Sequence, residues 1–208
     1  MLFDVNRVTP KGISGGGSGS YRPSGLLRGV VLLLLVSTIG WLSPEPLHAE
    51  SPTTGSEYRI KGAMIYKILS YVEWPTDLFP SESSPLTICV LGSGPMESAI
   101  PLLNGQQQKG RRLAALMITY PEEAGKCQVL VINSSELSQL PDLLHKIRLI
   151  PLLTISDING FAESGGVIEL GREGNRIRME INPAAARQNR IRISSQLLKL
   201  ARIVKGEK

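Results

Sequence analysis

A search for catalytic chemistry in this chain begins with His145, which lies between Leu144 and Lys146 in a segment with helical spacing. A nucleophilic triad needs an activated serine beside such a histidine, and residues 50–208 contain no Gly-x-Ser-x-Gly elbow. A zinc site is equally poorly supported, because this part of the chain has no second histidine. The better interpretation of His145 is an exposed surface residue.

Carboxylates offer a second route to catalysis, because a close acid/base pair can cleave a glycosidic bond. The candidates are Glu122-Glu123 and the isolated residues Asp157, Glu163 and Glu169. Nothing in the surrounding sequence predicts the apolar pocket that would separate their pKa values. We therefore expect ordinary surface acids, and neither a catalytic residue, a metal nor a cofactor is predicted.

Gly92-Ser93-Gly94 resembles the start of a dinucleotide-binding loop, since it follows an apolar run and precedes a helical segment. The third glycine of that fingerprint is replaced by Glu97, whose carboxylate would repel a pyrophosphate. A tight turn is the simpler interpretation.

Arginine is the best candidate for recognition. Arg176 and Arg178 alternate with apolar residues on a predicted hairpin, and guanidinium groups suit bidentate binding of a carboxylate or phosphate. Three more follow at Arg187, Arg190 and Arg192, so the last part of a chain of net charge +5 is its most basic. The alternative is that these arginines only keep an exposed surface soluble.

The N-terminal region indicates export. Arg22 and Arg28 precede an apolar run at residues 29–42, and Leu47-His48-Ala49 offers a small residue at the cleavage position. The run has 14 residues, whereas a membrane-spanning helix needs about 20. We therefore predict a signal peptide over residues 1–49, a linker over 50–56 and one domain over 57–205; an uncleaved anchor is the alternative. Export makes nucleic acid a poor candidate for a partner.

Two cysteines remain after the predicted cleavage, Cys89 and Cys127, both in apolar runs that resemble strands. An even count in an oxidising compartment favours one disulfide. Two buried free thiols are the alternative.

Hydrophobic periodicity predicts an α/β sandwich: a mixed, largely parallel central sheet, extended by an antiparallel hairpin, with helices on its faces. An amphipathic helix is expected over residues 57–72, with one apolar face made by Ile60, Ala63, Met64, Ile68, Tyr71 and Val72. Asn182 or Pro183 should start a short helix. Ser194 or Ser195 should cap the last helix, whose inward side chains are expected to be Leu197, Leu198, Leu200, Ala201 and Val204. The other elements expected are strands at 86–91, 113–119, 127–132, 152–155, 167–170 and 176–181, and helices at 96–103 and 140–148.

Five ordered blocks resemble the YfiR family of periplasmic proteins. They are Tyr71-Val72-Glu73-Trp74-Pro75 after the first helix, then residues 86–92 (LTICVLG), 153–166 (LTISDINGFAESGG), 175–182 (NRIRMEIN) and 193–204 (ISSQLLKLARIV). The resemblance covers about residues 57–205. It implies a disulfide between Cys89 and Cys127, whereas a second cysteine pair found in some members is missing here.

This resemblance implies a non-enzymatic, periplasmic regulator. YfiR-type proteins hold a membrane-bound diguanylate cyclase (YfiN) inactive through its periplasmic sensor region, which lowers cyclic di-GMP and disfavours biofilm. An OmpA-like outer-membrane lipoprotein (YfiB) sequesters them, and members form homodimers. The same partners and a homodimer are therefore expected here.

Large apolar residues in loops are the side chains that most often anchor such interfaces, and Trp74 and Phe161 are the candidates. Packing at the ends of the core is the alternative for both, and Arg176 and Arg178 are weaker candidates for the partner surface. The rival function is a periplasmic protein that binds a small ligand in the crevice near residues 92–95 and 156–161.

Overall fold

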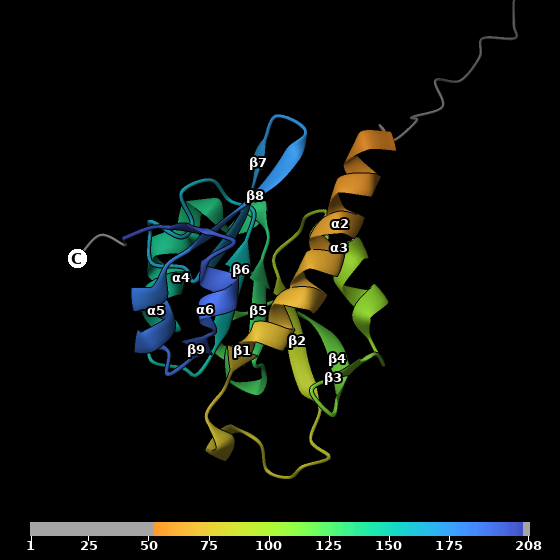
Figure 1. Ribbon diagram of the computed structural model, residues 1–208, viewed down its shortest axis with the longest axis vertical. Helices are drawn as coiled ribbons and strands as arrows, with labels where there is room; N and C mark the ends of the chain where they lie inside the picture. Colours follow the sequence, from red (N-terminus) through yellow and green to blue (C-terminus); the bar gives the residue numbers. More distant parts are fainter. Residues whose placement is uncertain (1–51, 206–208) are drawn as a thin grey trace, which may run out of the picture. The chain divides into compact units, whose positions relative to one another are not determined.

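A mixed sheet of eight strands forms the centre of the part that the structure describes, residues 52–205 of a computed structural model (Figure 1). In sheet order the strands are β10 (Arg202–Ile203), β8 (Arg176–Ile181), β7 (Ile168–Glu173), β6 (Leu153–Ser156), β5 (Val129–Ile132), β2 (Leu86–Leu91), β4 (Arg111–Ile118) and β3 (Gln107–Gln108). The central strands of the sheet are parallel neighbours, and two antiparallel pairs, β7–β8 and β3–β4, extend it, which confirms the predicted α/β fold.

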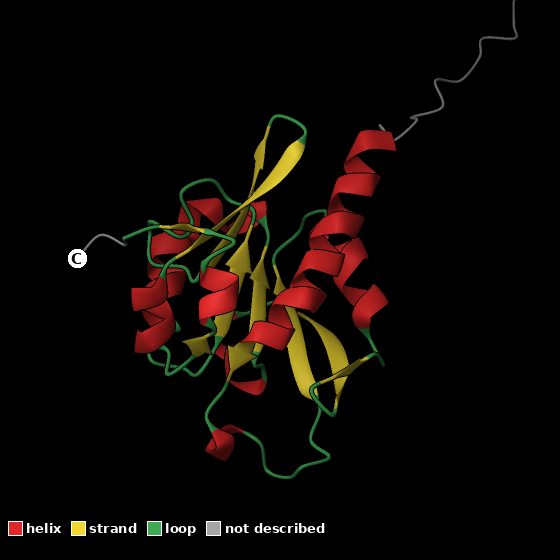
Figure 2. Ribbon diagram, in the orientation of Figure 1, coloured by secondary structure: helices red, strands yellow, loops and turns green. Residues whose placement is uncertain are grey.

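Helices and short 3-10 turns connect and cover these strands (Figure 2). A further two-stranded sheet pairs β1 (Val72–Glu73) with β9 (Arg192–Ile193). The helices are α2 (Pro52–Ile68), α3 (Met96–Ala99), α4 (Leu140–Lys146), α5 (Pro183–Gln188) and α6 (Ser195–Leu198), and the 3-10 turns span Leu69–Tyr71, Thr76–Leu78, Ile100–Leu103, Pro121–Lys126 and Ser134–Gln139.

The predicted signal peptide, residues 1–49, lies outside the described residues, so its boundaries stay a prediction. Helix α2 begins at Pro52, inside the segment that the sequence predicts as a linker. Within residues 52–205, no helix is both long and apolar enough to cross a membrane.

The core consists of two clusters, one on each side of the sheet, because the side chains of a strand alternate between its faces. In β2, Ile88 and Val90 belong to the cluster beneath α2, whereas Cys89 and Leu91 belong to the cluster beneath α4. All six residues of β2 are buried, as expected for a parallel strand covered on both faces. Cys89 and Cys127 form a disulfide within the second cluster, with their Cα atoms 5.9 Å apart.

The last element differs most from the sequence prediction. Ser194 caps α6 by accepting a hydrogen bond from the Leu197 N–H, as expected, but the helix ends at Leu198. Arg202 and Ile203 then form β10 beside β8, and the Val204 N–H donates to the Ile181 carbonyl. A two-residue strand has no periodic pattern, so the sequence offers no signal for it. Asn182 caps α5 as predicted, accepting from the N–H groups of Ala184 and Ala185.

Candidate functional site

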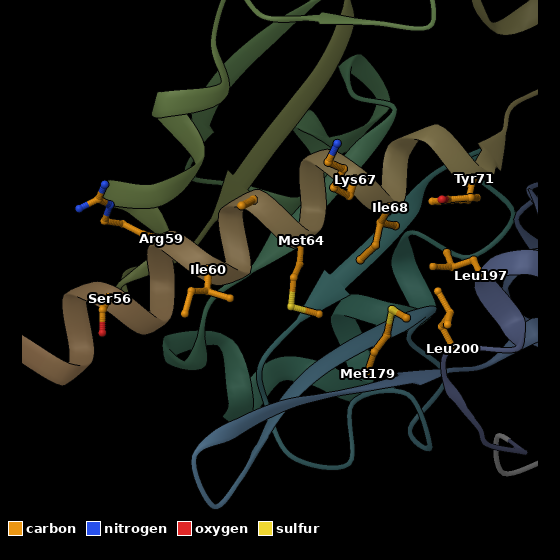
Figure 3. Close-up of a pocket in the computed structure, with 11 residues that line it drawn as sticks. Ser56, Arg59, Ile60, Met64, Lys67, Ile68, Tyr71, Met179, Leu197 and Leu200 are labelled. Atoms are coloured by element: carbon orange, nitrogen blue, oxygen red, sulfur yellow. The ribbon is translucent and has the colours of Figure 1, made fainter.

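An apolar groove of about 750 Å³ runs between helix α2, strand β8 and the segment that contains α6 (Figure 3). The first wall is a stripe of apolar residues along α2 and the turn after it, whose spacing of three or four positions brings them to one face: Ile60, Ala63, Met64, Ile68 and Tyr71. The second wall is Met179 of β8, and Leu197 and Leu200 close one end. The complete lining is Ser56, Arg59, Ile60, Ala63, Met64, Lys67, Ile68, Tyr71, Met179, Leu197 and Leu200.

The stripe on α2 corresponds to the apolar face that the sequence predicts for this helix, but most of it does not enter the core. Ile60 is 54% exposed, and Met64 and Tyr71 are only partly buried. The core contact is made by Ile65, by Ile68, which is the one buried member of the stripe named above, and by Leu69 just after the helix; all three are almost completely covered. Helix α2 therefore has apolar side chains on two faces and uses only one of them to hold the fold.

The opposite wall is built by segments that are distant in sequence. Met179 lies on the face of β8 that packs towards α2, and Figure 3 shows its side chain directed into the same space as that of Met64. Leu197 is buried, whereas Leu200, just after α6, is 73% exposed. Flexible methionines on both walls suit a surface that adapts to the shape of an apolar partner.

Two cations lie at the rim of this groove, and no carboxylate belongs to its lining. Arg59 and Lys67 come from α2, and Figure 3 shows both directed away from the apolar space. Contiguous apolar surface of this kind marks interaction sites, whereas isolated exposed side chains do not. The groove can thus bind an apolar segment that carries negative charge at its edge.

A buried ion network fixes the position of α2. Lys61 is 2% exposed, and its Nζ lies 2.8 Å from Glu57 Oε1 and 2.9 Å from Asp157 Oδ2. Arg172 of β7 reaches Glu57 at 3.3 Å. Burial, together with the neighbouring Asp157 and Glu57, raises the pKa of the Tyr58 phenol. Asp157, considered above as a catalytic acid, thus holds the groove's main helix in place.

The two aromatic residues predicted as partner contacts lie at the core. The Trp74 Nε1–H donates to the Gln128 carbonyl at 3.0 Å, and its ring packs against the first core cluster. Phe161 is 0% exposed and so close to Gly166 that a Cβ there would overlap its ring. In this conformation a partner has no access to Phe161, and its position matches the core-packing alternative.

The two arginines predicted for recognition differ in environment. Arg176 is exposed and lines a smaller pocket next to the groove, together with Arg172 and Asn175. Arg178 is instead held by acids, with its Nε 2.6 Å from Glu180 Oε1 and its Nη2 3.7 Å from Glu169 Oε1. Of the pair, Arg176 is the one that is free to meet a ligand.

The remaining candidate groups have structural surroundings. Burial, with the charge of Glu180 beside it, raises the pKa of Glu169, whose Oε1 lies 3.7 Å from Arg178 Nη2. The N–H groups of Thr119 and Tyr120 donate to Glu123 and lower its pKa. Gly92 has a φ of 76°, and the Asn133 amide donates to its carbonyl, consistent with a tight turn.

Sequence reasoning missed the groove as a site. The sequence predicts that residues 60, 64, 68 and 71 share one face of the helix, and such a face is normally expected to pack against the core. Met179 and Leu200 are separated from it by more than a hundred residues, so only the folded sheet brings them together. One feature of the sequence does point to the groove: α2 has more apolar residues than a single buried face requires.

The sequence profile of the family described as YfiR/HmsC-like matches residues 58–202 of this chain. Among curated proteins, none matches.

Two solved structures are similar to part of this chain. One is a conserved domain protein from Vibrio cholerae O1 biovar El Tor, with 14% identity and a TM-score of 0.49. The other is an ABC domain in complex with L-Trp from Streptococcus pneumoniae, with 11% identity and a TM-score of 0.47. Each match covers 71% of this chain and 60% of the other chain.

Proposed function

Because the chain belongs to the YfiR/HmsC-like family, we propose that it is a non-enzymatic periplasmic regulator that binds and represses a membrane-bound diguanylate cyclase. The observation that supports this proposal is the groove between α2, β8 and α6, an accessible apolar surface on a well-packed domain. Its occupant is an apolar segment of the cyclase's periplasmic region, with acidic residues at its edge to meet Arg59 and Lys67.

Binding alone is sufficient for such regulation. A protein that binds one state of a two-state receptor more tightly shifts the receptor towards that state. A hundredfold shift needs about 2.7 kcal/mol of differential affinity. A few apolar side chains that become buried in a groove supply free energy of this order. A homodimer and an OmpA-like lipoprotein that competes for the regulator belong to the same proposal.

The test measures cyclic di-GMP production by the full-length cyclase in membranes, with purified, oxidised 50–208 protein added on the periplasmic side. We expect saturable repression, which Leu200→Glu weakens by about tenfold or more, because a charge replaces an apolar contact. The matched control is Leu137→Glu, since Leu137 is 58% exposed and does not line the groove. No repression by the unaltered protein, or equal loss from both variants, would contradict the proposal.

A second candidate function is the binding of a small periplasmic ligand in the same groove. Its volume lies within the range of small-molecule sites, about 300–1,000 Å³, and Arg176 and Asn175 supply polar groups to a smaller pocket beside it. This position differs from the crevice predicted near residues 92–95 and 156–161. Native mass spectrometry of protein isolated from the periplasm distinguishes the two functions, because a retained small molecule of constant mass supports only the second.

A further inference from the structure

A second, polar cavity of about 390 Å³ lies away from the groove, where α4, β6, the loop at residues 164–165 and the end of α5 meet (Figure 1). Its apolar wall comes from Leu144 of α4 and from Ile147, the residue that follows the helix. The rest of its lining is polar, with the side chains of Thr154, Gln188 and Asn189 and the cationic or titratable groups of Arg148 and His145. The size suits a single small-molecule ring.

Two side chains of this lining are buried and only partly used by the fold. Thr154 is 1% exposed, and its hydroxyl oxygen accepts a hydrogen bond from the Val167 N–H at 2.9 Å. Asn189 is 8% exposed, and its Nδ2 donates to the Leu152 carbonyl at 2.9 Å. Within residues 52–205, the Thr154 hydroxyl proton has no acceptor and Asn189 Oδ1 has no donor. One donor and one acceptor are thus available at fixed positions in the cavity lining.

The exposed part of the lining includes the guanidinium group of Arg148 and the imidazole of His145. His145 lies in the last turn of α4, Arg148 follows just after the helix, and no Asp or Glu belongs to the lining. Glu163, which precedes the loop, is paired with Arg202 at 3.8 Å. Among the described residues, the side chains of His145, Arg148 and Gln188 make no hydrogen bond or ion pair. These donors are consequently available to an anion.

We propose that this cavity binds a small anionic polyol, a sugar ring bearing a carboxylate or a phosphate. The ring hydroxyl groups meet the Thr154 hydroxyl and Asn189 Oδ1, the ring face packs on Leu144 and Ile147, and the anionic group lies between Arg148 and His145. Guanidinium groups bind both anions with charge-assisted hydrogen bonds. This inference concerns a different surface from the groove and does not depend on the proposed regulatory function.

The experiment is a titration of the oxidised 50–208 protein, followed by two-dimensional NMR and calorimetry, with glucuronate and glucose 6-phosphate as the probes. Glucose and inorganic phosphate are the comparison ligands. We expect saturable binding of at least one charged sugar, with the amide shifts concentrated at Ser164, Gly165, Gln188 and Asn189. Glucuronate alone would identify a carboxylate ligand, and glucose 6-phosphate alone a phosphate ligand.

The variant Arg148→Gln should weaken binding of that sugar by roughly tenfold or more, because it removes a charge-assisted pair. The matched control is Arg112→Gln, an exposed arginine of β4 that does not line the cavity. Three results would overturn the proposal: no binding of either charged sugar at about 10 mM, glucose or inorganic phosphate binding as tightly as the charged sugar, or equal effects from the two variants. Because Arg148 is exposed, its replacement leaves the core intact, and the amide spectrum itself reports folding.

Discussion

The two faces of the sheet both have a buried core, and they differ in whether exposed apolar side chains gather into a groove beside it. On the face that contains the disulfide, Phe161, Leu130 and Ile132 are completely covered. On the face beneath α2, Ile60 and Leu200 remain more than half exposed beside a buried core. Burial of apolar surface is the main stabilising contribution to folding, so exposed apolar residues that form one groove contribute little of it. We infer that both faces stabilise the domain and that the groove on the second face is in addition available for a partner.

The largest predicted effect on stability comes from the face of the sheet that contains the disulfide. Phe161→Ala removes a completely buried ring that fits against Gly166 and should lower the free energy of unfolding by about 3–5 kcal/mol. Urea unfolding measures this change in the free energy of unfolding. The control is Phe79→Ala, at a half-buried ring beside Arg111, which should lower the free energy of unfolding by about 1 kcal/mol. A loss at Phe161 no larger than the control's would revive its interpretation as a partner contact.

The disulfide provides the next effect. Replacing both Cys89 and Cys127 with alanine opens a loop of 38 residues, and we expect a loss of about 3–4 kcal/mol. Thermal unfolding of the unaltered protein with and without a reductant supplies the control, because the double variant should not respond to the reductant. Unchanged stability in both experiments would mean that the disulfide does not stabilise this face of the sheet.

A substitution in the ion network beneath α2 tests whether this network holds the helix that forms one wall of the groove. Lys61→Met leaves the carboxylates of Glu57 and Asp157 without their shared cation and should cost about 3 kcal/mol. Lys67→Met, at an exposed lysine on the same helix, should change stability by no more than about 0.5 kcal/mol. Similar results from the two variants would mean that the network does not anchor the wall.

The smallest effect is a pH dependence. The pKa of Glu169 is raised above 4.5 by burial and by Glu180, so from pH 4.5 up to its folded-state pKa the folded chain binds more protons than the unfolded chain. This carboxyl group therefore makes stability fall as the pH rises through that window. In that pH window, Glu169→Gln should shift the slope of unfolding free energy against pH in the positive direction, whereas Glu82→Gln, at an exposed position, should leave it unchanged. A slope that becomes more negative in Glu169→Gln would contradict the assigned sign.

The elements that the sequence predicts well are those whose signals are local. The buried run at β2, the alternating hairpin of β7 and β8, and the Asn182 and Ser194 caps depend on neighbouring residues, and the structure contains all of them. A single oxidisable pair is likewise readable from composition, and the disulfide is present.

What the sequence does not reveal depends on distant contacts. A lysine in an amphipathic helix is normally placed in solvent, yet Lys61 is buried because Asp157 and Glu57 neutralise it. With Lys61 and Ile65 directed to the core, the more apolar stripe of Ile60 and Met64 turns outward. The position of the groove therefore depends on the ion pair between Lys61 and Asp157, which are 96 positions apart in the sequence.

The most direct test of the groove as the regulatory surface is photocrosslinking to the cyclase. Met64 is replaced by a photoreactive amino acid, with the same replacement at Leu137 as the control, and each protein is irradiated with membranes that contain the full-length enzyme. We predict that the Met64 protein still represses the cyclase at saturation and crosslinks to its periplasmic region, whereas the Leu137 protein represses it without crosslinking. Crosslinks from Leu137 alone, or repression with no crosslink from Met64, would contradict the account.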